Sequence, residues 1–297
     1  MMKQSISYYL TLGIIKLKGI KKSFSNDPVD YKTIRKEDVY QPKGSFFKKY
    51  TTKLFKVLES LVTQIEYKSG DSKKLLIFVH GGAFISGPSK HHWDTVKTLA
   101  KNTDFTIWLC NYPKAPEFKI RQISNNIDAI YNRALKNYKA ENIILIGDSV
   151  GGTLVTALTQ RLIAKTKELP KKLILVSPVM DASMSNTDIP IIENVDPMLS
   201  MKGILSAKKM CAGEVSLEDN MISPIYGSFK NFPETILFIS ENDIMYPDQL
   251  LAINKLKNEN ILHQVIIGKN MPHIWPFLPV MKEAKIALNQ IINELNS

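Results

Sequence analysis

Cysteine is scarce in this chain of 297 residues, which contains only Cys110 and Cys211. Two thiols this far apart provide neither a disulfide framework nor the close spacing of a zinc site. Cys110 ends the apolar run FTIWLC, so we expect it to be buried and inert. A reducing compartment suits this composition, and we therefore predict a cytoplasmic protein.

Long apolar runs are also missing, and none reaches the roughly 20 residues that cross a bilayer. The stretch 5–19 is short, and lysines follow it without the small-residue cleavage site of a signal peptide. We expect it to form an amphipathic helix that covers the protein, and weak contact with an anionic membrane surface is the alternative. The apolar stripe of this helix consists of Ile6, Tyr9, Leu10, Gly13, Ile14 and Leu17.

Acidic residues are fewer than basic ones, 28 against 39, which gives a formal net charge of +11. The basic residues are spread along the whole chain, whereas nucleic-acid-binding proteins concentrate them on one face or in a known module. We therefore attribute the charge to composition and solubility, and we expect no nucleic-acid partner.

Short apolar runs alternate with longer helical patterns from residue 73 onward, and only the stretch near residue 60 is ambiguous. Runs rich in Ile, Leu and Val that alternate with helices predict an α/β fold, with a mainly parallel sheet covered on both faces. The predicted strands are 74–80, 105–110, 142–148, 172–178, 235–240 and 263–268. The predicted helices are 93–102, 121–138, 152–167, 247–259 and 280–295.

Two segments lie outside this alternation. Residues 23–50 are polar and contain prolines, which predicts a loose connection between the first helix and the body. Residues 181–222 are rich in Asp, Ser, Met and Asn, and we expect them to form an insertion. Ligand sites of such sheets lie beyond the carboxyl ends of the strands, so the insertion should cover that end.

The sequence GDSVGG follows the predicted strand 142–148 and contains a Gly-x-Ser-x-Gly pattern around Ser149. A serine on a sharp turn between strand and helix is held in a strained conformation that needs small neighbours. A simple glycine-rich turn or a phosphate loop is the alternative. The lysine of a phosphate loop and a Gly-x-Gly-x-x-Gly pattern are both missing, which argues against nucleotide binding.

Three further loops supply the other parts of a hydrolytic site. The sequence HGGA follows the first predicted strand, and backbone amides near Gly81, Gly82 and Val150 can bind an oxyanion. Asp243 follows the strand 235–240, and His273 follows the strand 263–268. The chain order Ser149, Asp243, His273 is that of the α/β-hydrolase fold.

The sequence resembles the hormone-sensitive-lipase-like esterases of the α/β-hydrolase superfamily. The resemblance covers residues 74–280 and rests on seven motifs, HGGAF, NYPKAPE, GDSVGG, DPMLS, SPIYG, ENDIM and MPHIWPF. It implies that Ser149 is the nucleophile, Asp243 the acid and His273 the base, with the amides of Gly81, Gly82 and Val150 as oxyanion donors. One departure is Ala83, where the family usually has a third glycine.

The resemblance also implies a helical cap, and we divide the chain into an N-terminal cap segment, 1–45, and a core domain, 46–297. The core carries a cap insertion at about 181–222. Pocket walls could come from Met198, Leu199, Trp275 and Phe277, which could equally belong to the core. Because His91 and His92 look like a solvated helix start without a nearby carboxylate or cysteine ligand, we expect no metal, and the chemistry needs no cofactor.

The predicted function is a serine carboxylesterase that cleaves short- to medium-chain acyl esters of small molecules. An amidase, a sugar deacetylase or a peptidase could use the same three residues, because fold and triad do not separate them. A lipase recruited to lipid by the N-terminal helix, and a homodimer, are also left open. Non-catalytic members of the family have lost the histidine, so His273 argues against a binding protein.

Overall fold

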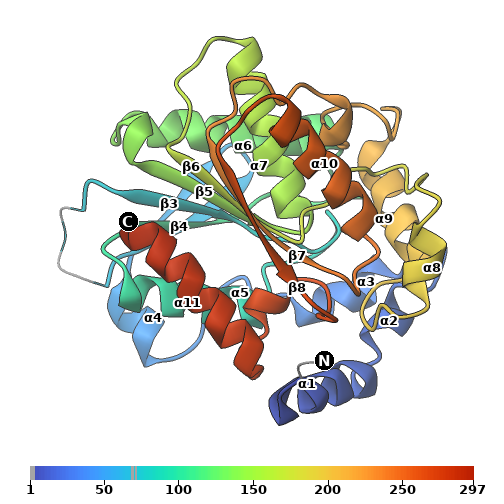
Figure 1. Ribbon diagram of the computed structural model, residues 1–297. Coiled ribbons are helices and arrows are strands. Elements are labelled where there is room, and N and C mark those ends of the chain that lie inside the picture. The colour runs from blue at the N-terminus through green and yellow to red at the C-terminus, as the bar shows by residue number, and fades with distance from the viewer. Residues whose placement is uncertain (1–3, 68–69, 71) are drawn as a thin grey trace.

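The computed structural model describes residues 4–67, 70 and 72–297. An eight-stranded sheet forms its centre, with the strand order β1-β2-β4-β3-β5-β6-β7-β8 (Figure 1). The strand β2 pairs antiparallel with β1 and β4, and all other neighbours are parallel. The strands are β1 (Thr51–Val57), β2 (Ser60–Ile65), β3 (Leu75–Val79), β4 (Thr106–Asn111), β5 (Ile143–Asp148), β6 (Lys172–Val176), β7 (Glu234–Ser240) and β8 (His263–Gly268).

Helices cover both faces of this sheet (Figure 1). One face carries α4, α5 and α11, and the other carries α6, α7 and α10. These helices are α4 (Ser45–Tyr50), α5 (Lys90–Asn102), α6 (Ile120–Ala134), α7 (Val150–Ala164), α10 (Tyr246–Asn258) and α11 (Lys282–Asn296). Every residue of β3, β5 and β6 is buried, as their continuous apolar sequences require in a sheet covered on both sides.

The predicted α/β fold with a mainly parallel sheet is confirmed. All six predicted strands and all five predicted helices of the core are present, with ends that differ by a few residues. The ambiguous stretch near residue 60 forms the hairpin β1–β2. Among the helices of the described residues, none has both the length and the apolarity needed to cross a membrane.

The two segments that we expect to form a cap, 1–45 and 181–222, contain further helices. These are α1 (Ile6–Leu17), α2 (Ile20–Ser23), α3 (Tyr31–Ile34), α8 (Ile189–Glu193) and α9 (Met201–Ala212). The segment 23–50, which we expected to be a loose connection, is instead bonded to the body. The amide of Val29 donates to Ser206 Oγ in α9 at 3.0 Å, and the indole of Trp93 donates to the carbonyl of Val39 at 2.6 Å.

The orientation of α1 differs from the prediction. Its apolar stripe faces solvent, and the opposite face is buried through Tyr8, Thr11 and Ile15. Polar bonds fix this orientation: Tyr8 Oη donates to the carbonyl of Asn270 at 2.7 Å, and Ser5 donates to Glu283 in α11. The helix therefore packs on the protein, but not with the side that its sequence pattern favours.

We predict that a methyl group at Gly203 separates the N-terminal segment from α9. A Cβ atom there would collide with the backbone carbonyl of Phe24, and such overpacking costs about 1–3 kcal/mol. In Gly203→Ala, trypsin should therefore cleave the segment after Lys18, Lys21 and Lys22 faster than in the wild type. Gly13→Ala is the control, since no atom lies within 4 Å of a Cβ there. Equal cleavage of Gly203→Ala and wild type would contradict this packing.

Candidate functional site

Ser149 lies on the sharp turn between β5 and α7. Its backbone has φ 52° and ψ −124°, a conformation that residues other than glycine rarely adopt. The turn is tight enough to need glycines on both sides, since a Cβ at Gly147 would lie 2.5 Å from the carbonyl carbon of Gly151. The amide of Ser149 donates to the carbonyl of Val176 at 2.9 Å, which fixes the turn against the end of β6.

Asp243 and His273 follow the last two strands of the sheet, β7 and β8. His273 Nδ1 lies 2.7 Å from Asp243 Oδ2, and both side chains are buried. The amide of Ile274 donates to Ser177 Oγ at 3.0 Å, which ties the histidine loop to the end of β6. Because Asp243 engages Nδ1, the other ring nitrogen of His273 is left to act on a reacting group.

Burial by itself would lower the pKa of His273, but three carboxylates outweigh it. The charge and hydrogen bond of Asp243, followed by the charges of Asp196 and Asp148, raise this pKa above its ordinary value. Burial and the charge of Asp243 also raise the pKa of Asp196 to about 6. An imidazolium at His273 is therefore stabilised by an acidic surrounding.

Asp196 connects the cap insertion to the loop of Asp243. Its Oδ1 accepts the amides of Met198 and Leu199 at 2.7 and 2.9 Å, and its Oδ2 accepts the amide of Ile244 at 2.9 Å. All three donors are backbone groups, two in the insertion and one directly after Asp243. Sequence reasoning missed this role, although Asp196 begins the DPMLS motif.

The glycine loop after β3 is arranged differently from the prediction at Gly81. The amide of Gly81 donates to Asp148 Oδ1 at 3.0 Å, so it is engaged within the protein. Within the described part of the chain, no group accepts a hydrogen bond from the amides of Gly82, Ala83 or Val150. The oxyanion donors we expected at Gly82 and Val150 are thus free, and Ala83 offers a third amide in place of Gly81.

His92 holds the other oxygen of Asp148, with its Nε2 3.2 Å from Asp148 Oδ2. The prediction that His91 and His92 form a solvated helix start is wrong, because His92 is buried and His91 half-buried. The signal that could have revealed this pair is the aspartate of GDSVGG. Asp148 ends β5, the strand next to β3, so it lies at the same edge of the sheet as the glycine loop. His92 and Asp148 therefore fix the position of Gly81.

A metal could in principle use this group, since ligand atoms of His91, His92 and Asp148 lie within 4.8 Å of one another. Asp148 supplies the carboxylate that the sequence did not place near the histidines. However, the amide of Ser89 donates to His92 Nδ1 at 2.9 Å. A neutral imidazole that accepts at Nδ1 carries its proton on Nε2, which suits donation to Asp148 rather than metal ligation.

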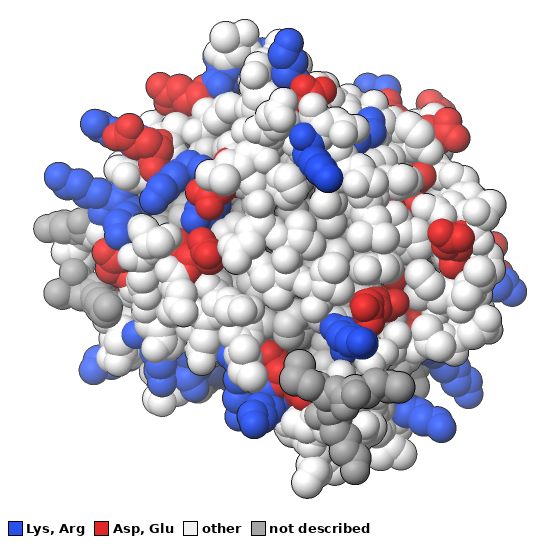
Figure 2. Space-filling view, in the orientation of Figure 1, with Lys and Arg blue, Asp and Glu red and all other residues white. Residues whose placement is uncertain are grey.

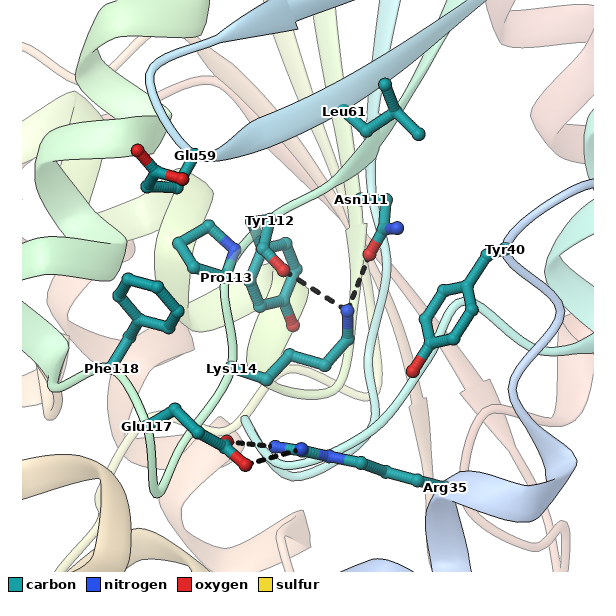
Figure 3. Close-up of a pocket in the computed structure, with 10 residues that line it drawn as sticks. All are labelled: Arg35, Tyr40, Glu59, Leu61, Asn111, Tyr112, Pro113, Lys114, Glu117 and Phe118. Atoms are coloured by element: carbon teal, nitrogen blue, oxygen red, sulfur yellow. Dashed lines mark hydrogen bonds and ion pairs between the residues drawn. The ribbon is translucent and has the colours of Figure 1, made fainter.

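A separate pocket of about 260 Å³ lies between the N-terminal segment, the hairpin β1–β2 and the end of β4 (Figure 3). At its edge, Arg35 forms a bidentate pair with Glu117 and donates to the carbonyls of Ile85 and Ala115 at 2.6 Å each. The amino group of Lys114 points toward Asn111 Oδ1, and burial lowers the pKa of this lysine to about 8. Arg35 thus attaches the cap segment to the glycine loop.

The four predicted pocket residues are all buried, and two of them pack against the sheet. The indole of Trp275 donates to the carbonyl of Ile239 in β7 at 3.1 Å, and Phe277 lies 5.6 Å from Phe78 in β3 between ring centroids. For Trp275 and Phe277 the alternative of core packing is therefore favoured. Met198 and Leu199 belong to the insertion next to Asp196.

Known proteins with similar sequences and structures include esterases and a lipase. A family model described as alpha/beta hydrolase fold matches residues 76–277. An esterase of Acinetobacter venetianus is 29% identical over 230 residues, which are 76% of each chain. Mouse hormone-sensitive lipase is 27% identical over 135 residues, 44% of this chain and 18% of the lipase. The crystal structure of an esterase from the bacterial hormone-sensitive lipase family superposes with a TM-score of 0.86, at 21% identity and 99% and 98% coverage.

We predict that Asp196→Asn lowers the pKa of His273, because it removes one of the negative charges that stabilise the imidazolium. NMR titration of the His273 ring in wild type and variant measures this change. Asp248→Asn is the control, since Asp248 is also a buried carboxylate but is not among the charges that raise this pKa. An unchanged titration of His273 in Asp196→Asn would contradict the assignment.

Proposed function

We propose that Ser149 is the nucleophile of this chain, which belongs to the α/β-hydrolase fold family and groups there with the hormone-sensitive-lipase-like esterases. Membership of this family makes the chain a carboxylic ester hydrolase. The observation that carries this proposal is the 2.7 Å contact between His273 and Asp243, at the same edge of the sheet as the strained turn of Ser149. Ser149, Asp243 and His273 follow the ends of β5, β7 and β8.

The reaction proceeds in two steps. Ser149 Oγ attacks the ester carbonyl while His273 Nε2 takes its proton, and His273 then protonates the leaving alcohol. Asp243 keeps the proton of His273 on Nδ1 and stabilises the imidazolium. Water, activated by His273, then attacks the acyl-enzyme, and Ser149 recovers its proton.

The amides of Gly82 and Val150, with that of Ala83, bind the oxyanion that forms in each step. Backbone donors that are already oriented need little reorganisation when the charge forms, so the free-energy cost of binding it is small. Gly81 contributes indirectly: its amide bond to Asp148 orients the loop that carries Gly82 and Ala83.

The substrates we propose are esters of short- to medium-chain acyl groups, with Met198 and Leu199 as walls of the acyl pocket. Ser149 is only 9% exposed, and the insertion that carries these two residues is bonded to the loop of Asp243, which supports a confined site. Amides, acetylated sugars or peptides could enter the same chemistry. The two cysteines are free and buried, which suits the cytoplasmic location that we propose.

We expect Ser149→Ala to lower kcat for p-nitrophenyl esters by roughly 10⁴–10⁶-fold, because the acyl-enzyme cannot form. Turnover of acetate, butyrate, octanoate and palmitate esters should fall steeply beyond the medium-chain lengths. Matched p-nitroanilides distinguish an amidase from an esterase. Ser228→Ala is the control and should keep wild-type rates, since Ser228 is exposed in the loop before β7. A Ser149→Ala enzyme as active as wild type would exclude this nucleophile.

We expect His92→Leu to lower kcat by about 10²-fold while KM changes little, because a small displacement of the oxyanion loop weakens binding of the transition state alone. Steady-state kinetics on p-nitrophenyl butyrate measure both constants, and circular dichroism monitors folding. His263→Leu is the matched control, since His263 lies at the start of β8, away from the glycine loop. A folded His92→Leu variant with wild-type kcat would contradict the positioning role.

A further inference from the structure

Among the residues that the structure describes, none covers the apolar face of the helix α1, which is exposed to solvent. The exposed fractions are 80% for Ile6, 59% for Leu10 and 89% for Leu17, and Tyr9 and Ile14 lie on the same stripe with 56% and 46%. Exposed apolar residues are ordinary when scattered, but five on one side of a twelve-residue helix form a continuous strip. Such a strip marks an interaction surface.

The surroundings of this strip are basic. No aspartate or glutamate occurs between residues 4 and 26, whereas Lys16, Lys18 and Lys22 are exposed there. The neighbouring helix α11 adds Lys282 and Lys285, which are exposed beside the attachment of α1. In Figure 2, side chains of Lys and Arg are visible along the lower part of the molecule, the part in which α1 lies. The acidic residue Glu283, at the start of α11, is already bonded to Ser5.

We propose that α1 docks the protein on an anionic lipid surface. An amphipathic helix in this position lies in the plane of the interface, with its apolar side among the acyl chains and its lysines at the phosphates. The aliphatic stems of the lysines can lie along the apolar strip while their ammonium groups reach the headgroups. A second copy of the chain is a poorer partner, because it would bring the same lysines and a net charge of +11 to the contact.

The inner face of α1 gives this surface a fixed relation to the site. Tyr8 Oη donates to the carbonyl of Asn270, and Gln4 donates to the carbonyl of Lys269, so the helix is bonded to the loop that leads into His273. The docking surface therefore lies on the side of the molecule that carries the triad loops. The proposal itself does not depend on the reaction, since binding to lipid can be measured without turnover.

The test compares sedimentation of wild type, Leu10→Gln/Leu17→Gln and Leu262→Gln with vesicles of phosphatidylglycerol and phosphatidylcholine. We expect wild type to bind, binding to weaken in 0.5 M NaCl as expected for charge screening (roughly a 4 Å Debye length), and vesicles of phosphatidylcholine alone to bind less. The double variant should lose about 100-fold in partitioning, roughly tenfold for each leucine. Both leucines are exposed, so the variant should fold normally, as circular dichroism can show.

Leu262→Gln is the matched control, since Leu262 is 71% exposed but precedes β8, at the opposite end of that strand from the loop that α1 contacts. It should bind like the wild type. Failure of wild type to bind, or equal binding by the double variant, overturns the proposal. Analytical ultracentrifugation adds a further outcome: a wild-type dimer that the double variant converts to a monomer would assign the strip to a second copy of the chain and overturn the lipid assignment.

Discussion

The backbone of Ser149 is held in a conformation that costs about 1–3 kcal/mol, and the packing around it has to offset that cost. The carbonyl of Ser149 accepts the amides of Gly152 and Val179, and its own amide donates to Val176. The glycine loop approaches so closely that a Cβ at Gly81 would lie 2.9 Å from the Cβ of Ser149. The turn of Ser149 and the glycine loop after β3 are therefore packed so closely that neither can move without the other.

Buried carboxylates are the second constraint, because three of them raise the pKa of one imidazole. Each is satisfied by hydrogen bonds: Asp243 by His273 and the amide of Met245, Asp148 by His92 and the amide of Gly81. Asp196 has only backbone donors, and burial next to Asp243 raises its pKa to about 6. The negative charge around His273 favours an imidazolium on this ring, which the proton transfer that we propose from Ser149 would create.

Much of the fold followed from sequence, because a buried parallel strand needs a continuous apolar run and a turn at its end. The positions of Asp243 and His273 after β7 and β8 could be predicted in the same way. The partner of Gly81 could not, since the periodicity of a helix start does not reveal that His92 is buried against Asp148. The sequence pattern also indicated the wrong buried face of α1, for a related reason. Its apolar stripe indicates one face, but the polar bonds of Ser5 and Tyr8 to distant residues decide which face is buried.

The segments that we expect to form the cap are joined to the site mainly through bonds to backbone groups. Their position therefore depends little on the side chains around these bonds. Arg35 donates to two carbonyls besides its pair with Glu117, and Asp196 accepts three amides. Backbone donors and acceptors are present whatever side chains the neighbouring positions carry. The side chains of Met198 and Leu199 can therefore change without loss of these bonds, so the acyl pocket that we propose can vary while the loops of Asp243 and Gly82 keep their positions. Exchange of Arg35 or Asp196 does remove such bonds, because here the side chain itself joins two segments.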